Sequence, residues 1–402
     1  MSVFAKIKGD KAIWATVGLL AVFSFLPVYS ASSNLAYLYG DGSTFHYLVT
    51  HFIYLFLGFV IMYFIHKVPY HYFKGLSILV LPILVLLLIY TISQGLVIDG
   101  ANASRWIRIP FVDKTFQTST LASVVLLTYV ARYMAKLKDR EFTFKDTILP
   151  LWVPVALILG LILPANFSTT AILFCMVLLL VFIGGYPLKY LGIIVGTGVL
   201  FLALFILTAK AFPGVFPNRV DTWISRVENF ANDEVTDADY QIEKAKIAIA
   251  SGGIAGNGIG KSVQRNFLPQ SSSDFIYAII VEEMGLIGGF GVMLAYLMLL
   301  FRIIIVATKA NSVFGKLLVI GIGLPIVFQA LVNMAVAVEL FPVTGQTLPL
   351  ISSGGSSIWM TCLALGMVLS VSAKREEEIK LKETKVENLD NANPLEILSQ
   401  AI

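Results

Sequence analysis

Ten runs of predominantly apolar residues, most of them close to twenty residues long, constrain the fold of this 402-residue chain more than any other feature. A helix needs about 20 such residues to cross the hydrocarbon core of a bilayer. Only 13% of the residues are charged, whereas soluble domains carry about 25%. We therefore predict an all-α polytopic membrane protein of about ten transmembrane helices, near Ala12–Tyr29, Leu48–Ile65, Phe73–Ile92, Leu121–Ala135, Ile148–Leu163, Thr169–Gly184, Leu188–Leu207, Phe275–Phe301, Phe314–Val338 and Ser352–Val371.

Lysines and arginines gather in alternate loops between these spans, and such clusters mark the cytoplasmic side of a membrane. The largest cluster runs from Arg132 to Lys145. We therefore expect both termini in the cytoplasm. The predicted membrane domain covers residues 1–373, and a charged tail, 374–402, is expected to be partly disordered. The longest outer loop, residues 208–273, joins the seventh and eighth spans.

Two outer loops also carry positive charge, which that rule disfavours only weakly when a loop is long. One interpretation is that the loops are simply solvated. The other is that they bind an anionic ligand on the outer face, and phosphate-bearing lipid head groups suit lysine and arginine well. The cations that we consider for such a site are Arg105, Arg108, Lys246, Lys261 and Arg265.

A run of three serines and one aspartate enters the eighth span from the outside. Ser273 or Asp274 could merely cap this helix, since both residue types are favoured N-caps. Alternatively, a carboxylate at the level of the lipid head groups could accept a proton from a sugar hydroxyl. The two roles are compatible, and Asp274 is our candidate catalytic residue.

Further polar residues lie inside the predicted spans. Glu282 and Glu283 would sit about 12 to 14 Å into the membrane, where ionisable groups are functional candidates by default. Gln329 and Asn333 are four residues apart and share a helix face, so hydrogen bonding between helices is their simplest role. They could also satisfy a buried glutamate, and together the four form a supporting polar core.

The outer loop contains two local patterns. An amphipathic stripe over Tyr240–Ala250 suits a helix that lies in the membrane interface. The glycine-rich segment that follows, Ser251–Ser262, nearly matches a phosphate-binding P-loop, but Ala255 replaces the first required glycine and the segment faces away from cytoplasmic nucleotides. We therefore exclude nucleotide binding and retain a glycine-rich turn that allows close backbone approach.

The loop before the last span, Pro342–Ser357, combines two prolines, paired glycines and several serines. These residues predict a fixed re-entrant turn, because non-helical backbone at membrane depth is tolerated only when it is buried in protein or lines a cavity.

These motifs, together with Glu282-Glu283-Met284-Gly285, Leu268-Pro269 and Tyr240-Gln241, resemble the SEDS family (FtsW, RodA and SpoVE) across nearly all the spans. The resemblance implies a ten-helix SEDS fold and a peptidoglycan glycosyltransferase that polymerises lipid II on the outer face of the bacterial cytoplasmic membrane. It further implies a class B penicillin-binding protein as partner. The family's essential outer-loop acid maps onto Asp274, and Gln241 and Ser353 fall in motif positions that we assign to substrate binding.

The run Thr347–Ser352 is closer to the division members (FtsW), so septal synthesis with other divisome membrane proteins is expected. The chain departs from the family pattern at two places. Thr120 and Ser123 replace a charged pair at the start of the fourth span, and Asn166 stands where an acid is common. Any mechanism that requires those charges is therefore in doubt here.

The resulting hypothesis is that Asp274 deprotonates the acceptor sugar while Arg105, Lys246 and a candidate divalent cation, Mg²⁺ or Mn²⁺, stabilise the departing pyrophosphate. The metal ligands are unknown, and no nucleotide or nucleic acid is expected. The alternatives are a lipid II flippase that uses Glu282 and Glu283, an elongation-type polymerase like RodA, and a scaffold without chemistry.

Overall fold

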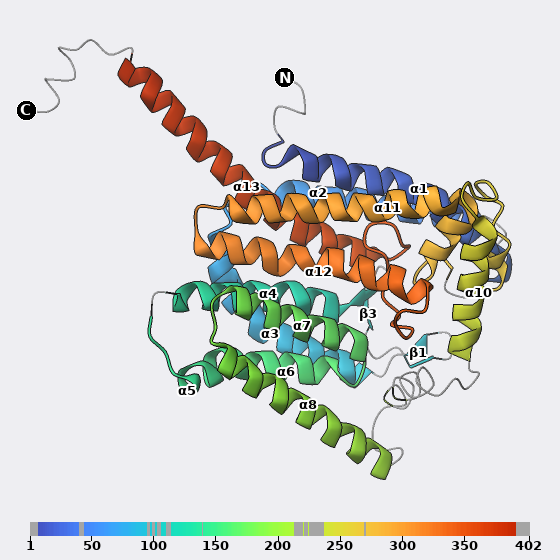
Figure 1. Cartoon of the computed structure of the whole chain (residues 1–402), viewed down its shortest axis with the longest axis horizontal. Coiled ribbons are helices and arrows are strands. Elements are labelled where there is room, and N and C mark those ends of the chain that lie inside the picture. The colour runs from blue at the N-terminus through green and yellow to red at the C-terminus, as the bar shows by residue number, and fades with distance from the viewer. Residues whose placement is uncertain are drawn as a thin grey trace, which may run out of the picture.

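The fold is a bundle of long helices that run side by side (Figure 1). The computed structural model describes residues 7–39, 44–94, 97–98, 101–102, 106–109, 114–138, 140–212, 220, 224, 237–268 and 271–390. Every predicted span has a helical counterpart: α1 (Lys11–Tyr39), α2 (Thr44–Ile65), α3 (Tyr72–Gln94), α4 (Thr118–Leu137), α5 with η2 and α6 (Phe144–Ile162), α7 (Phe167–Ile183), α8 (Leu188–Ala211), α11 (Ile276–Thr308), α12 (Val313–Ala337) and α13 (Gly355–Asp390). Within the described residues, nine of these are long and apolar enough to cross a membrane, and α7 is a shorter apolar helix.

The helix α12 lies at the centre of the bundle. It contacts α4, α7, α11 and α13, and most of its length is buried, as is most of the apolar part of α13 within Gly355–Glu376. By contrast, α8 is almost wholly exposed and contacts α7. Because lipid solvates apolar side chains as well as protein does, an exposed apolar helix is stable there. The buried core therefore sits between α11, α12, α13 and α4.

The two ends of the bundle differ in construction (Figure 1). At one end lie the short turns that join α2 to α3, α4 to α5, α7 to α8 and α11 to α12. These turns carry the lysines and arginines that predict the cytoplasmic side. The opposite end, which we call the outer end, holds α10 (Asp237–Gly252), the 3₁₀ turn η3 (Gln264–Asn266) and the loop before α13.

Two short strand pairs at the outer end were not predicted. Short antiparallel strand pairs, β1 (Val97–Ile98) with β2 (Ala101–Asn102) and β3 (Trp106–Ile109) with β4 (Lys114–Gln117), precede α4. In the second pair Trp106 lies opposite Gln117. The hairpin satisfies backbone groups of the outer loop and leads directly into α4 at Thr118.

The helix predicted over residues 240–250 is confirmed as part of α10. The stripe residues Ile242 and Ala245 are buried, with Ala248, against Phe275 and Ile279 at the start of α11. An apolar helix face is stabilised equally well by protein and by lipid. The helix α10 therefore packs on α11 through this face, and its location in the membrane interface stays a prediction.

Candidate functional site

Asp274 lies in a turn, residues 271–275, that leads into α11 at the outer end. The helix itself begins at Ile276 with Phe275 in the N-cap position, so Ser273 and Asp274 both precede the cap. The simple capping role considered from the sequence is therefore wrong for these two residues. The Asp274 side chain is partly exposed, and the Ser273 hydroxyl donates a hydrogen bond to its Oδ1 atom over 2.8 Å.

The backbone of this turn is held by hydrogen bonds from two other elements. The Nδ2 atom of Asn333, in α12, donates to the carbonyl oxygen of Asp274 at 2.7 Å. The hydroxyl of Ser352 donates to the carbonyl of Ser273 at 2.6 Å, and the amide and hydroxyl of Ser353 both donate to the carbonyl of Ser272 at 2.9 Å. Buried polar groups hold position when their partners are satisfied. The carboxylate of Asp274 therefore projects from a fixed backbone.

The predicted re-entrant turn before α13 is confirmed as a fixed structure. Asn333 also donates to the carbonyl of Gln346 at 2.8 Å, and Gln329 donates to the carbonyl of Thr347 at 2.8 Å. Tyr296, fully buried in α11, donates to the carbonyl of Pro349. Gln329 and Asn333 thus join helices and loops, as predicted for hydrogen-bonding groups between spans, and they satisfy loop carbonyls instead of a glutamate.

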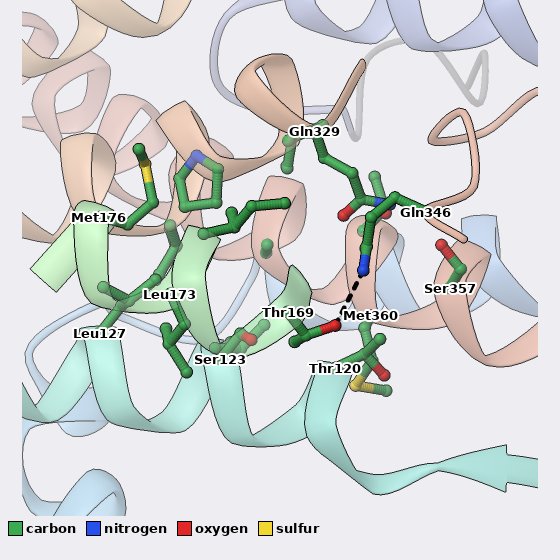
Figure 2. Close-up of a pocket in the computed structure, with 17 residues that line it drawn as sticks. Thr120, Ser123, Leu127, Thr169, Leu173, Met176, Gln329, Gln346, Ser357 and Met360 are labelled. Carbon is green, nitrogen blue, oxygen red and sulfur yellow. Dashed lines mark hydrogen bonds between the residues drawn. The ribbon is translucent and has the colours of Figure 1, made fainter. Parts of the chain in front are cut away.

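A cavity of ≈ 80 Å³ lies between α4, α7, α12 and α13, beneath this turn (Figure 2). Gln346 points across it and donates to the hydroxyl of Thr169 at 2.9 Å, while Gln329 lines its other side. Thr120 and Ser123, which stand where the family usually has a charged pair, both line this cavity. Its described walls are neutral, because the remaining lining residues are Val124, Leu127, Ile172, Leu173, Met176, Ile322, Pro325, Ile326, Ser357, Met360, Thr361 and Ala364.

Asn166, the position where an acid is common in the family, has a structural role in this chain. Its side-chain oxygen accepts a hydrogen bond from the Thr169 amide at 3.2 Å and so caps the start of α7. An uncharged amide caps a helix as well as a carboxylate does. The substitution therefore keeps the local structure without supplying a negative charge.

Glu282 and Glu283 are buried in α11 and bind the outer loop. The carboxylate of Glu282 accepts a hydrogen bond from the Ser262 hydroxyl. It also accepts from the backbone amides of Val263, at 2.9 Å, and Gln264, at 3.2 Å. Glu283 accepts from the amide of Ser262 at 3.2 Å and from the hydroxyl of Ser30 in α1. Charge-assisted hydrogen bonds of this kind are about twice as strong as neutral ones.

The glycine-rich segment passes directly over a break in α11. Gly285 has φ +66°, a left-handed conformation inside the helix, and the amide of Leu286 bonds to the carbonyl of Gly253 at 2.9 Å. A Cβ atom on Gly256 would lie 2.2 Å from the carbonyl oxygen of Glu283. The close backbone approach expected of this segment is therefore present, and its partner is α11.

The described candidate cations have different surroundings. Lys246 pairs with Glu339 at 2.5 Å, and this hydrogen bond raises the pKa of the lysine above its ordinary value. The guanidinium of Arg265 donates to the hydroxyl of Ser30 at 2.8 Å. Arg108 on β3 and Lys261 near the end of the glycine-rich segment are exposed.

The three remaining candidate substrate-binding residues are Arg105, Gln241 and Ser353. Arg105 lies outside the described residues, so its position is not assigned. Gln241 is half-buried in α10, and Ser353 lies next to the Asp274 turn, where it donates to the carbonyl of Ser272. The substrate-binding role expected of both residues stays a prediction. Among the described residues there is no group of three or more His, Cys, Asp or Glu side chains that could hold a metal ion.

Sequence reasoning missed the residues that connect these groups. Gln346 and Thr169 link the re-entrant turn to α7, and Ser262 with Ser30 links the outer loop to α11 and α1. Gln346 carried a signal, since it is the one amide side chain in the predicted fixed turn. Ser30 carried none, because a serine near the end of an apolar span is an ordinary helix residue.

Comparisons with known proteins assign this chain to a family. Residues 10–377 match the FtsW/RodA/SpoVE family, described as cell cycle proteins. A relative from Geobacter sulfurreducens, named as a probable peptidoglycan glycosyltransferase FtsW, is 32% identical over 370 residues, which cover 91% of this chain and 95% of that protein. A Coxiella burnetii protein with the same name is 30% identical over 83% of this chain and 88% of its own length.

Solved structures show the same fold. The crystal structure of the rod shape determining protein RodA from Thermus thermophilus is 25% identical, with a TM-score of 0.64 over 91% of this chain and 97% of that chain. A chain from a peptidoglycan synthase complex, at 24% identity, has a TM-score of 0.70 over 91% of this chain and 98% of its own. The extended family match and the curated relatives together show that this chain belongs to the FtsW/RodA/SpoVE family of cell cycle proteins.

Proposed function

We propose that this chain is a peptidoglycan glycosyltransferase of the division type, which polymerises lipid II into glycan strands on the outer face of the bacterial cytoplasmic membrane. Family membership and the name that its relatives share support this activity. The observation that carries the proposal is the placement of Asp274: a partly exposed carboxylate on a backbone that α12 and the turn before α13 hold in position.

The proposed chemistry requires one base. The Asp274 carboxylate accepts the proton of the acceptor sugar hydroxyl as that oxygen bonds to the anomeric carbon of the donor. The bond between that carbon and the lipid pyrophosphate breaks, and the pyrophosphate leaves with the bonding electrons. Because the donor already carries a good leaving group, a second carboxylate is not needed, in contrast to glycosidases.

Charge compensation for the pyrophosphate comes from cations of the outer end. Lys261 and Arg108 are exposed there and are the candidates that we favour. Lys246 contacts Glu339, and Arg265 contacts Ser30. A divalent cation, Mg²⁺ or Mn²⁺, would be held by Asp274 together with phosphate oxygens of the substrate, since Mg²⁺ commonly binds through one or two carboxylates and substrate phosphates.

The test is polymerisation of lipid II by the purified full chain in detergent, with Asp274→Asn compared with Glu243→Gln. Loss of a general base costs about 10²–10⁴-fold in rate, so glycan chains should disappear in Asp274→Asn. Glu243, an exposed carboxylate of α10, provides the control and should keep the wild-type rate. A normal rate in Asp274→Asn would refute the assigned role.

The same assay separates the alternatives. A flippase makes no glycan chains in detergent. A scaffold is recognised in cells instead, because it supports division even with Asp274→Asn. Titration with Mg²⁺ or Mn²⁺ and removal by a chelator test the cation, which should raise the rate by lowering the cost of the charged leaving group.

The proposed partners are a class B penicillin-binding protein and other divisome membrane proteins. A synthase complex among the structural matches supports the first of these. Addition of the purified partner to the polymerisation assay tests whether it changes the rate of this chain.

A further inference from the structure

A second and larger cavity lies at the opposite end of the bundle from Asp274. Its volume is ≈ 530 Å³, and its walls come from α4, α7, α11 and α12 with the turns that leave them. Pockets that bind drug-sized ligands have volumes of about 300–1,000 Å³. The cavity is therefore large enough for part of a lipid molecule, whereas the cavity beneath the Asp274 turn is not.

The wall of this cavity is mostly apolar and reaches the surface of the bundle. Ile183 at the end of α7 and Ile304 in α11 both line it, yet their side chains are 43% and 46% exposed. Ile304 lies in α11, which is long and apolar enough to cross a membrane, and Ile183 ends the shorter apolar helix α7. Exposed apolar side chains of this kind are suited to contact with lipid. The cavity thus opens beside an exposed apolar surface that suits an acyl chain.

Two lysines line the same cavity where the helices end. Lys138 is the C-cap residue of α4, and Lys316 lies in the first turn of α12. Both are exposed, and among the described residues neither has an ion-pair partner. An unpaired lysine at the membrane surface is placed to bind phosphate. The cavity thus combines an apolar wall with two cations at its polar edge.

We infer that this cavity binds one anionic phospholipid, with its phosphate between Lys138 and Lys316 and an acyl chain along the wall that Ile183 and Ile304 form. Basic pockets between transmembrane helices on the cytoplasmic side bind anionic lipid head groups in this way. Assignment to the cytoplasmic leaflet rests on the proposed orientation, whereas the binding itself does not. The site is separate from Asp274 and is not required for the glycosyl transfer step.

The test uses the purified full chain in nanodiscs, with phosphatidylglycerol that carries a photoreactive group on its acyl chain. Phosphatidylcholine with the same group is the neutral reference, and mass spectrometry maps the cross-linked peptides. We expect phosphatidylglycerol to label α7 and α11 around Ile183 and Ile304. The double variant Lys138→Gln with Lys316→Gln should reduce this labelling about tenfold.

Two further variants control the experiment. Lys136→Gln with Lys309→Gln removes the same charge from exposed positions that do not line the cavity, and labelling should stay at the wild-type level. Thr308→Trp fills the cavity without removing charge, because the exposed Thr308 lines it, and labelling inside should be lost. Equal labelling by both lipids, or labelling that survives Thr308→Trp, overturns the inference.

Discussion

At the scale of single residues, one amide connects the candidate base to the rest of the site. Asn333 is buried and donates to the carbonyl oxygens of Asp274 and Gln346. It does not reach the reacting atoms, so it acts as a positioning residue for the turn that carries Asp274. Its effect on the reaction passes through backbone geometry, where misplacement by about 1 Å can cost 10²-fold in rate.

We expect Asn333→Leu to lower both stability and polymerisation. The substitution leaves two carbonyl groups without this donor, at a cost of about 1–3 kcal/mol for each in the free energy of unfolding. Thermal unfolding in detergent and the lipid II assay measure the two effects. Asn257→Leu, at an exposed position of the outer loop, is the matched control and should change neither. Wild-type activity in Asn333→Leu contradicts the positioning role.

The ion pair between Lys246 and Glu339 predicts a dependence of stability on pH. The hydrogen bond from Lys246 to Glu339 raises the pKa of the lysine above its ordinary 10.5. The stabilisation is therefore complete below 10.5 and is lost as the pH rises through the pKa of the folded state. We expect Lys246→Met to melt at a lower temperature than the wild type near neutral pH, with a difference that shrinks in strong alkali.

Melting curves for wild type and Lys246→Met across the alkaline range check this expectation. Lys261→Met removes an exposed cation of the same outer end. Its difference in melting temperature from the wild type should not shrink as the pH rises. A Lys246→Met deficit that stays constant into strong alkali shows that the pair is not its cause.

At the scale of elements, the contact between the glycine-rich segment and α11 leaves the least room for side chains, because backbone meets backbone there. Gly256 and Gly260 have nearly the same positive φ, +80° and +78°. A Cβ atom on Gly256 would lie 2.2 Å from the carbonyl oxygen of Glu283, whereas a Cβ atom on Gly260 would meet nothing within 4 Å. The two positions therefore separate backbone strain from steric exclusion.

We expect Gly260→Ala to cost about 1–2 kcal/mol, the ordinary penalty for a left-handed residue with a side chain. Gly256→Ala carries the same strain and also forces the segment away from α11, so it should unfold more readily and expose the outer loop to protease. Limited proteolysis of both variants compares them. Equal resistance of the two variants to protease would show that the contact between Gly256 and α11 tolerates a methyl group.

The helices were predictable because each carries its own signal, whereas the site required contacts between distant segments. All ten apolar runs, and the stripe that became α10, correspond to helices. The β3–β4 hairpin has no strong turn signal and was missed. Glu282 and Glu283 were correctly selected as buried, but their partners at 262–264 are defined only once the outer loop folds onto α11. The pairing of Lys246 with Glu339 depends on tertiary contact in the same way.

At the scale of the whole molecule, the two ends of the bundle predict an orientation. Lysines such as Lys67, Lys138, Lys189 and Lys309 lie in or beside the turns at one end, and Asp274, just before the start of α11, lies at the other. In a variant without Cys175 and Cys362, we expect Lys309→Cys to react with an impermeant thiol reagent only after the cells are permeabilised. Glu243→Cys should react in intact spheroplasts. The reverse pattern would place Asp274 in the cytosol, where the proposed substrate sugar is not exposed for polymerisation.

The helix α13 joins these two ends as a single rod. It begins at Gly355, two residues after Ser353, and continues for 36 residues to Asp390. At 1.5 Å per residue it is about 54 Å long, and it leaves the bundle at the end opposite Asp274 (Figure 1). Where it leaves, Glu376 accepts a hydrogen bond from the backbone of Gly9. A force applied to the protruding end of α13 would thus be transmitted along the helix to the serines that hold the turn at the opposite end of the bundle.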